Sequence, residues 1–149
     1  NLIEYSGNTY VNGTGTTDQS GVELSFSNFS DTGSVKLFAT SLSSEKSDGS
    51  AQLRRPETSI GANIMRKINE DVKVVANYKF TSEHFDTHNS NWSTISMPET
   101  HLLDVGLKKD FGGYEIGINV FNVLDQDYQK PHGFSQDGRN LGFTFRRTF

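Results

Sequence analysis

Hydrophobic and polar residues alternate with a period of two along most of this chain, from about residue 20 to the C-terminus. The apolar members form seven runs: Val22, Leu24 and Phe26; Val35, Leu37 and Ala39; Ile60, Ala62, Ile64 and Ile68; Val72, Val74, Ala76, Tyr78 and Phe80; Leu103, Val105, Leu107 and Phe111; Tyr114, Ile116, Ile118 and Val120; Leu141, Phe143, Phe145 and Phe149. A period of two places alternate side chains on opposite faces of a β-strand. With the short stretch "NLIEY" at the start, the pattern predicts about eight strands and no helix.

The composition argues against a soluble protein with a large core. Only 33% of the 149 residues are hydrophobic, less than a soluble domain of this size usually contains. The sequence has no cysteine, which excludes a disulfide framework, a cysteine zinc site and a thiol nucleophile. The net charge of −4 comes without blocks of like charge, so nothing supports a nucleic-acid partner. No apolar run of about 18 residues predicts a transmembrane helix, but transmembrane strands alternate and leave no such run.

The connections between the predicted strands alternate strictly between short and long. Short turns are predicted at 28–33, 68–72 and 110–114, and long polar segments at about 43–57, 82–99 and 125–139. In an up-and-down sheet, alternate connections lie at the same end. One end of the sheet is therefore predicted to have only short turns, and the other to carry the long loops. Bacterial outer-membrane barrels have this asymmetry, with short periplasmic turns and longer extracellular loops.

Few charged residues interrupt the apolar face of the predicted strands. They are Arg66, Lys109 and Arg147, each one or two residues before a short turn or the C-terminus. There a long side chain can reach lipid headgroups, whereas Arg or Lys at mid-strand would cost about 2–4 kcal/mol. The opposite face carries many charged residues and is too polar to pack against a second sheet, as a β-sandwich requires. We therefore predict an all-β fold, an antiparallel transmembrane β-barrel.

The C-terminal third resembles the C-terminus of TonB-dependent outer-membrane receptors. In that family the penultimate strand runs into an Asn, two apolar residues, an Asp or Asn and, three residues later, a Tyr. A loop then ends in Gly-Arg, and the last strand alternates and closes on Phe. The matching residues here are Asn122, Val123, Leu124, Asp125, Tyr128, Gly138, Arg139 and Phe149. Leu124 stands where an aromatic residue is usual, and "GVELSFS" and "RRPETSIGANI" look like two further recurring stretches of the same barrel.

The resemblance implies that residues 1–149 are the C-terminal portion of the receptor barrel, roughly the last eight strands of a 22-stranded barrel. The earlier strands, the globular plug and the segment that contacts TonB would lie upstream of this chain. The C-terminus would be periplasmic, which makes the short turns periplasmic and the long connections extracellular. The loop lengths alone give the same sidedness.

The function implied by the resemblance is energised uptake of a scarce nutrient across the outer membrane of a Gram-negative bacterium. The ligand would be an iron–siderophore or a cobalamin-type corrinoid. The implied partners are outer-membrane lipid, the barrel-assembly machinery, a small-molecule ligand, and TonB through the missing N-terminal region. No cofactor and no enzymatic activity are expected. Two alternatives stay open: a complete small eight-stranded outer-membrane barrel with a structural or adhesive role, and a soluble β-sandwich that binds carbohydrate.

Candidate site residues lie in the predicted long loops and in the last strand. In one extended segment of a long loop, alternate side chains would project to the same side and are weak candidates for a metal site. His101 and His132 could approach this site as further ligands. A solvated surface loop is the simpler interpretation of the segment. These metal candidates are His84, Asp86 and His88. Candidates for ligand contact in the extracellular loops are Trp92, Tyr128, His132 and Phe134. Candidates for the signal read by the barrel-assembly machinery are Phe143, Phe145 and Phe149.

Overall fold

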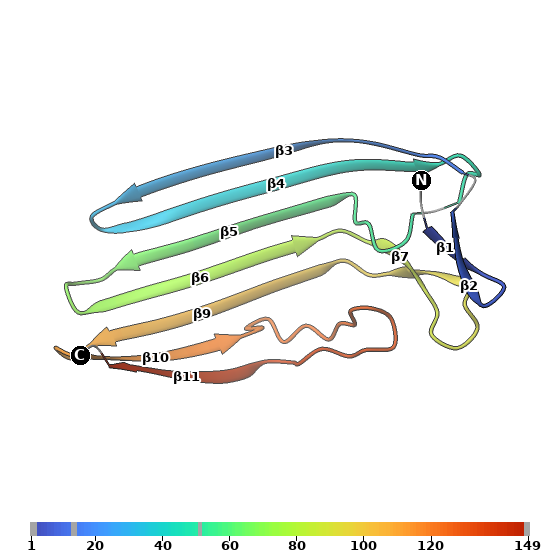
Figure 1. Cartoon of the computed structure of the whole chain (residues 1–149). Coiled ribbons are helices and arrows are strands. Elements are labelled where there is room, and N and C mark those ends of the chain that lie inside the picture. Colours follow the sequence, from blue (N-terminus) through green and yellow to red (C-terminus); the bar gives the residue numbers. More distant parts are fainter. Residues whose placement is uncertain (1–2, 13–14, 51, 148–149) are drawn as a thin grey trace.

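The computed structural model describes residues 3–12, 15–50 and 52–147, so Phe149 lies outside the described residues (Figure 1). Seven strands form one antiparallel sheet: β3 (Thr17–Ser30), β4 (Gly33–Lys46), β5 (Thr58–Lys67), β6 (Val72–Thr81), β9 (Thr100–Asp110), β10 (Tyr114–Phe121) and β11 (Asn140–Arg147). Two separate hairpins complete the described part: β1 (Ile3–Ser6) with β2 (Thr9–Asn12), and β7 (His84–Thr87) with β8 (Thr94–Met97). The predicted all-β antiparallel fold is confirmed. No helix in the described ranges is long and apolar enough to span a membrane.

The sheet is an up-and-down meander in a single layer. Its strand order is β11-β10-β9-β6-β5-β4-β3, so each strand lies beside its neighbour in sequence once the β7–β8 hairpin is set aside. The short turns β3–β4, β5–β6 and β9–β10 gather at one end, and the long connections and both hairpins lie at the other (Figure 1). The predicted alternation of short and long connections is therefore confirmed. We call these the short-turn end and the loop end.

The prediction of a strand at "NLIEY" is right, but its expected place among about eight strands of the sheet is wrong. Gly7 and Asn8 have φ values of 58° and 64° and connect β1 directly to β2, with Ser6 paired to Thr9. Two consecutive residues with positive φ make the type I′ turn that closes a tight hairpin. Because Ile3–Ser6 pairs locally in this way, the main sheet has seven strands rather than eight.

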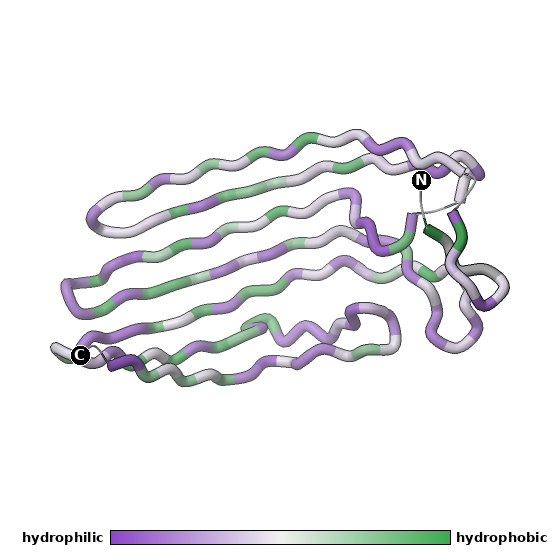
Figure 2. The backbone as a smooth tube through the Cα atoms, viewed as in Figure 1, coloured by the Kyte–Doolittle hydropathy of each residue, from purple (hydrophilic) through white to green (hydrophobic). Residues whose placement is uncertain are grey.

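The register of the strands keeps all apolar runs on one face of the sheet. One row across six strands contains Val35, Ile64, Ala76, Val105, Val120 and Leu141. Figure 2 shows the resulting alternation of hydrophobic and hydrophilic residues along each strand. We call the two sides the apolar face and the polar face.

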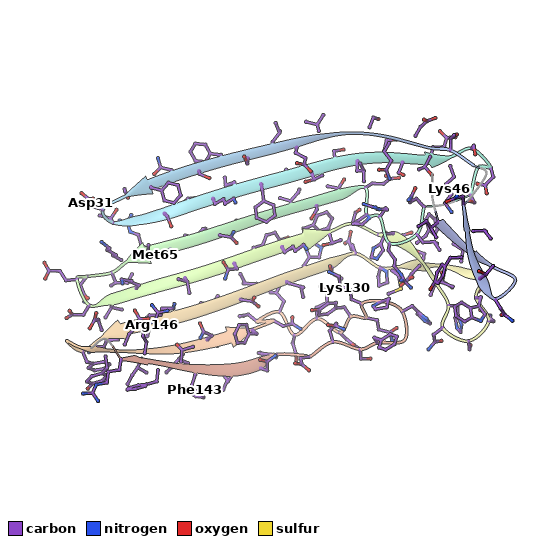
Figure 3. The ribbon with its side chains drawn as sticks, in the orientation of Figure 1. Asp31, Lys46, Met65, Lys130, Phe143 and Arg146 are labelled. Atoms are coloured by element: carbon purple, nitrogen blue, oxygen red, sulfur yellow. The ribbon has the colours of Figure 1, made fainter. Side chains whose placement is uncertain are left out.

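No layer of protein covers the apolar face in the described structure. Its large side chains stay exposed, Leu24 at 67% and Phe143 at 73% (Figure 3). Met97, in the small β7–β8 hairpin, is the hydrophobic residue that is buried among those described. A sheet of this length without a core of its own is stable only if another apolar medium covers the apolar face.

The three cations of the apolar face lie at the short-turn end, as predicted. Arg66 is paired with Gly33 beside the β3–β4 turn, and its Nη1 donates to Thr32 Oγ1 over 3.3 Å. Lys109 holds its Nζ 5.0 Å from the ring centroid of Phe111, a cation–π contact. Arg147 is paired with Tyr114, the first residue after the β9–β10 turn. All three side chains thus start from the rim of the sheet and not from its middle.

One cross-strand contact on the polar face involves an aromatic residue and a glycine. Phe38 on β4 is paired with Gly61 on β5, and its ring lies over the glycine, where a Cβ atom would overlap it. Replacing Gly61 by alanine would force the ring to turn away, so we expect the free energy of unfolding to fall by about 1 kcal/mol. The measurement is urea unfolding of the protein, with detergent covering the apolar face. Asn63→Ala, on the same face of the same strand, is the control, and equal stability of the two variants would contradict the expectation.

Candidate ligand-binding site

Three long connections come together at the loop end of the sheet. They are residues 47–57 between β4 and β5, residues 82–99 with the β7–β8 hairpin, and residues 122–139 between β10 and β11 (Figure 1). The first two are joined through backbone. Leu53 forms a parallel bridge with Phe85, and the Arg54 N–H donates to the Phe85 carbonyl over 2.6 Å. This pairing places the Arg54 side chain next to Asp86, the residue that follows Phe85.

Asp86 links all three connections through its carboxylate. The residue is 1% exposed. Its Oδ1 accepts from Arg54 Nε and from the Thr87 N–H, each over 2.7 Å, and its Oδ2 accepts from the His132 N–H over 2.8 Å. A buried carboxylate is stable only when its oxygens are satisfied in this way. Asp86 therefore fixes the three connections relative to one another.

The environment of Asp86 keeps it ionised. Burial by itself would raise the pKa of Asp86, but the hydrogen bonds from the His132 N–H, Arg54 and the Thr87 N–H outweigh it and lower the pKa to about 2. The ordinary value is 3.8. Because the pKa is lowered when the loops are docked, the docked arrangement is favoured wherever the carboxylate is charged, by about 2 kcal/mol.

A pH dependence of the loops follows from this shift. The contribution of Asp86 is fully present above about pH 5 and is lost as the pH falls through 3.8 towards 2. We expect a spin label on Ser90→Cys, at the tip of the β7–β8 hairpin, to keep one spectrum from pH 7 to about 5 and to become more mobile below. The same label combined with Asp86→Asn should be mobile at pH 7 and show no transition. A transition that persists in this double variant would contradict the assignment.

A second set of hydrogen bonds shapes the connection 122–139. Asn122 is 5% exposed and has a φ of 48°, a conformation that Asn adopts more readily than most residues. Its Nδ2 donates to the carbonyls of Gln126 (2.9 Å) and Asp137 (3.3 Å), and its Oδ1 accepts from the Gln126 N–H (3.0 Å). Asp125 accepts from the N–H and the Nη2 of Arg139, at 2.8 and 2.9 Å. These bonds from Arg139, the backbone one first, lower the pKa of Asp125.

The motif residues Asn122, Asp125 and Arg139 thus have a structural role. They close the two ends of the connection 122–139 on each other, and the segment between them returns over the polar face of the sheet. The sequence motif predicted that these residues belong together, and the hydrogen bonds supply the physical reason.

A cavity of about 520 Å³ lies between the three connections and the polar face of the sheet. Strands β5, β6 and β9 supply polar-face residues at their loop ends, and the connections supply the rest. The lining residues are Arg54, Pro56, Ser59, Lys79, Thr81, His84, Asp86, Thr100, Leu102, Tyr128, Gln129, Lys130 and Pro131. Lys130 lies beside the loop end of β9 (Figure 3). The volume is in the range of small-molecule sites in proteins.

The weak metal candidates do not converge on one point. The Asp86 carboxylate is occupied by its three donors, and the His84 Nδ1 lies 3.3 Å from the Ser82 carbonyl oxygen. The His88 ring packs against His132, with centroids 4.7 Å apart. In the ranges that the structure describes, no group of three His, Cys, Asp or Glu side chains could hold a metal ion.

His101 lies on the other side of the sheet from the cavity. It is paired with Phe80 on the apolar face, with ring centroids 4.9 Å apart, and its Nδ1 lies 2.9 Å from the Tyr78 hydroxyl. Three rings therefore gather near the loop end of the apolar face. In transmembrane β-barrels, aromatic girdles occupy this position.

The four candidates for ligand contact lie in different surroundings. Tyr128 lines the cavity, and His132 contributes its backbone N–H to Asp86. Trp92 is 79% exposed in the turn between β7 and β8, and Phe134 is 64% exposed in the connection 122–139. Their contact with a ligand stays a prediction. The cations of the cavity, Arg54, Lys79 and Lys130, are additional residues that the sequence pattern did not single out as a group.

Comparison with models of known protein families gives no match, and neither does comparison with curated proteins. Solved structures do match. The ferripyoverdine receptor of the outer membrane of Pseudomonas aeruginosa, bound to ferripyoverdine, matches with a TM-score of 0.76 at 20% identity, over 88% of this chain and 19% of that chain. The FpvAI–pyocin S2 complex matches with a TM-score of 0.78 at 19% identity, over 88% of this chain and 20% of that chain.

A third structure, the ferric-catecholate import receptor Fiu from E. coli K12, matches with a TM-score of 0.77 at 18% identity, over 99% of this chain and 23% of that chain. The chain therefore spans about a fifth of the length of the structures that it matches. At these identities the likeness concerns the fold, and it extends over nearly the whole chain. The resemblance to TonB-dependent receptors inferred from the C-terminal motif is confirmed at this level.

Proposed function

We propose that this chain, which has the fold of TonB-dependent siderophore receptors, is the C-terminal portion of the barrel of such a receptor. In this role it would take part in the uptake of a ferric siderophore across the outer membrane. The observation that carries the proposal is the apolar face, which continues across all seven strands of the sheet and is covered by no other described element.

The two faces of the sheet divide the work of such a receptor. The apolar face contacts lipid, with Arg66, Lys109 and Arg147 at the headgroups of the inner leaflet, and the polar face lines the inside of the barrel. The short-turn end and the C-terminus are then periplasmic, and the loop end is extracellular. This orientation puts the 520 Å³ cavity where a ligand arriving from outside first meets the barrel.

The chain supplies the wall and the capturing loops of the receptor. Asp86 holds the loops together, and the cavity beneath them receives part of the ligand. The plug and the contact with TonB belong to segments outside this chain. Phe143, Phe145 and Phe149 are proposed as the signal read by the barrel-assembly machinery.

A ferric siderophore is the ligand that the comparisons favour. Two of the matched structures are receptors described for ferripyoverdine and for ferric catecholate, so receptors with this fold carry iron chelates. A cobalamin-type corrinoid remains the second ligand to be tested, since the stretch "RRP" fits either branch of the family.

Growth of a deletion strain tests the proposal. The full-length gene is returned to a strain that lacks its other iron-uptake receptors, and growth is followed on single ferric siderophores with TonB present or absent. We expect growth on at least one ferric siderophore, and only with TonB. In a parallel strain, cobalamin is the required nutrient. Rescue by cobalamin and by no iron chelate would overturn the proposed ligand, and rescue without TonB would overturn the transport mechanism.

A further inference from the structure

The charges that line the cavity are strongly unbalanced. Three cations, Arg54, Lys79 and Lys130, face one carboxylate, Asp86, so an excess of two positive charges remains. The whole sequence has a net charge of −4, so this excess is a local feature and does not follow from a basic chain. Among the described residues that line the cavity, no second carboxylate is available to neutralise it.

The one carboxylate of the cavity is already fully engaged. Both oxygens of Asp86 accept hydrogen bonds, and only the Nε of Arg54 is used in its ion pair. The Arg54 side chain is 61% exposed, and its two terminal nitrogens bond to no described residue. Asp86 therefore aims the guanidinium, and the fork of the guanidinium is left for another anion.

The two lysines are also without a protein partner in the described structure. Neither the Nζ of Lys79 on β6 nor the Nζ of Lys130 forms a hydrogen bond or an ion pair with a described residue. Lys79 projects from the polar face of the sheet, whereas Lys130 comes from the loop that covers it. The cations thus approach the cavity from two sides.

We propose that this cavity binds a multiply charged anionic iron chelate with oxygen donors, of the catecholate or α-hydroxycarboxylate class, in preference to an uncharged trihydroxamate chelate. The inference rests on the proposed function and names the chemical class of its ligand. Ligand oxygens carry the negative charge of such a chelate on its outside, where ammonium and guanidinium groups can contact it. Tyr128 offers an aromatic surface beside these charges, which suits a ligand with aromatic rings.

The test compares two variants that remove equal charge from the same face. The first is Lys79→Gln with Lys130→Gln, at the cavity. The second is Lys73→Gln with Lys108→Gln, two residues that pair with each other on the polar face at the short-turn end. The full-length receptor in detergent is titrated with a ferric tris-catecholate, with ferric citrate and with an uncharged ferric trihydroxamate, by quenching of tryptophan fluorescence at two salt concentrations.

For the wild type we expect binding of a catecholate or citrate chelate that weakens with added salt. The affinity should fall about tenfold in the cavity variant and stay within about twofold of wild type in the short-turn variant. Tighter binding of the trihydroxamate, or an equal effect of the two variants, would overturn the inference while leaving the proposed function intact. Binding of none of these three chelates would also overturn the inference, whereas the proposed function is tested separately by growth on single ferric siderophores. Comparing the titration with the ferric tris-catecholate and the titration with ferric citrate shows which of the two classes of anionic chelate the cavity binds.

Discussion

Replacing Asp86 by alanine will release the β7–β8 hairpin and the connection 122–139 from each other. The change leaves the Arg54 guanidinium and two backbone N–H groups, those of Thr87 and His132, without their acceptor. Breaking a buried ion pair from one side typically costs about 3–5 kcal/mol, but Arg54 can turn to solvent, so we expect about 2–3 kcal/mol. The population of the opened loops should rise roughly 30- to 150-fold.

Hydrogen exchange measures this opening directly. The amides that pair β7 with β8, from His84 to Met97, should exchange roughly 30- to 150-fold faster in the variant, because local opening limits their exchange. Amides of β5 and β6 should be unchanged. Asp127→Ala is the matched control, since Asp127 is an exposed aspartate on the neighbouring connection whose carboxylate bonds to no described residue. Similar exchange in the two variants would show that Asp86 does not hold the loops.

If the sheet is part of an outer-membrane barrel, as proposed, introducing an arginine at Ala76 will lower the amount of folded protein that reaches the membrane. Ala76 lies in the middle of β6 on the apolar face, between Ile64 and Val105 on the adjacent strands. In the proposed orientation, an arginine there enters the centre of the hydrocarbon layer, at a cost of about 2–4 kcal/mol. The three natural cations of this face avoid that cost because they start from the short-turn rim.

The neighbouring residue provides the control for this variant. Asn77 points to the polar face, opposite Asp104, so Asn77→Arg adds the same charge on the other side of the same strand. We expect wild-type amounts of heat-modifiable, folded protein for Asn77→Arg and a clear loss for Ala76→Arg. Equal losses would show that the apolar face is not the face in contact with lipid.

Much of the fold could be predicted because one rule governs it. Each strand of the sheet has one apolar face. The period of two in the sequence therefore predicts where the strands lie, which of their side chains share a face, and where the short turns between them lie. The rule does not cover segments that pair locally outside the sheet. Ile3–Ser6 has the alternation of a strand, yet the positive φ angles at Gly7 and Asn8 turn it into a hairpin with its neighbour. The dipeptide Gly7-Asn8 was the feature of the sequence that could have predicted this tight hairpin turn.

The site was less predictable because it is built from contacts between distant segments. The spacing of His84, Asp86 and His88 indicates a weak metal candidate, but these side chains do not converge, and the partner of Asp86 is an arginine 32 residues earlier in the chain. Arg54 reaches it only because Leu53 and Phe85 form a parallel bridge. Lys79 lies in a strand and Lys130 in a loop about 50 residues later in the sequence. Only the three-dimensional structure shows that both side chains line the same cavity.

The strands of the sheet differ in length, and in the proposed barrel this affects what lies outside the membrane. Strands β3 and β4 have 14 residues each, whereas β10 and β11 have 8. Towards the loop end, the outward side chains of β3 and β4 change from Val22 and Ala39 to polar residues. These are Asp18, Ser20, Ser41, Ser43 and Glu45.

Polar outward residues do not belong among acyl chains, so in the proposed barrel this part of β3 and β4 would stand above the hydrocarbon layer. At about 3.3 Å per residue, the five steps from Val22 to Thr17 correspond to roughly 17 Å along the strand. The external surface of the molecule on this side is therefore paired β-sheet and not loop. In the proposed orientation, an antibody or a bulky water-soluble reagent directed at Asp18, Ser43 or Glu45 would approach this paired sheet from the side, just above the hydrocarbon layer.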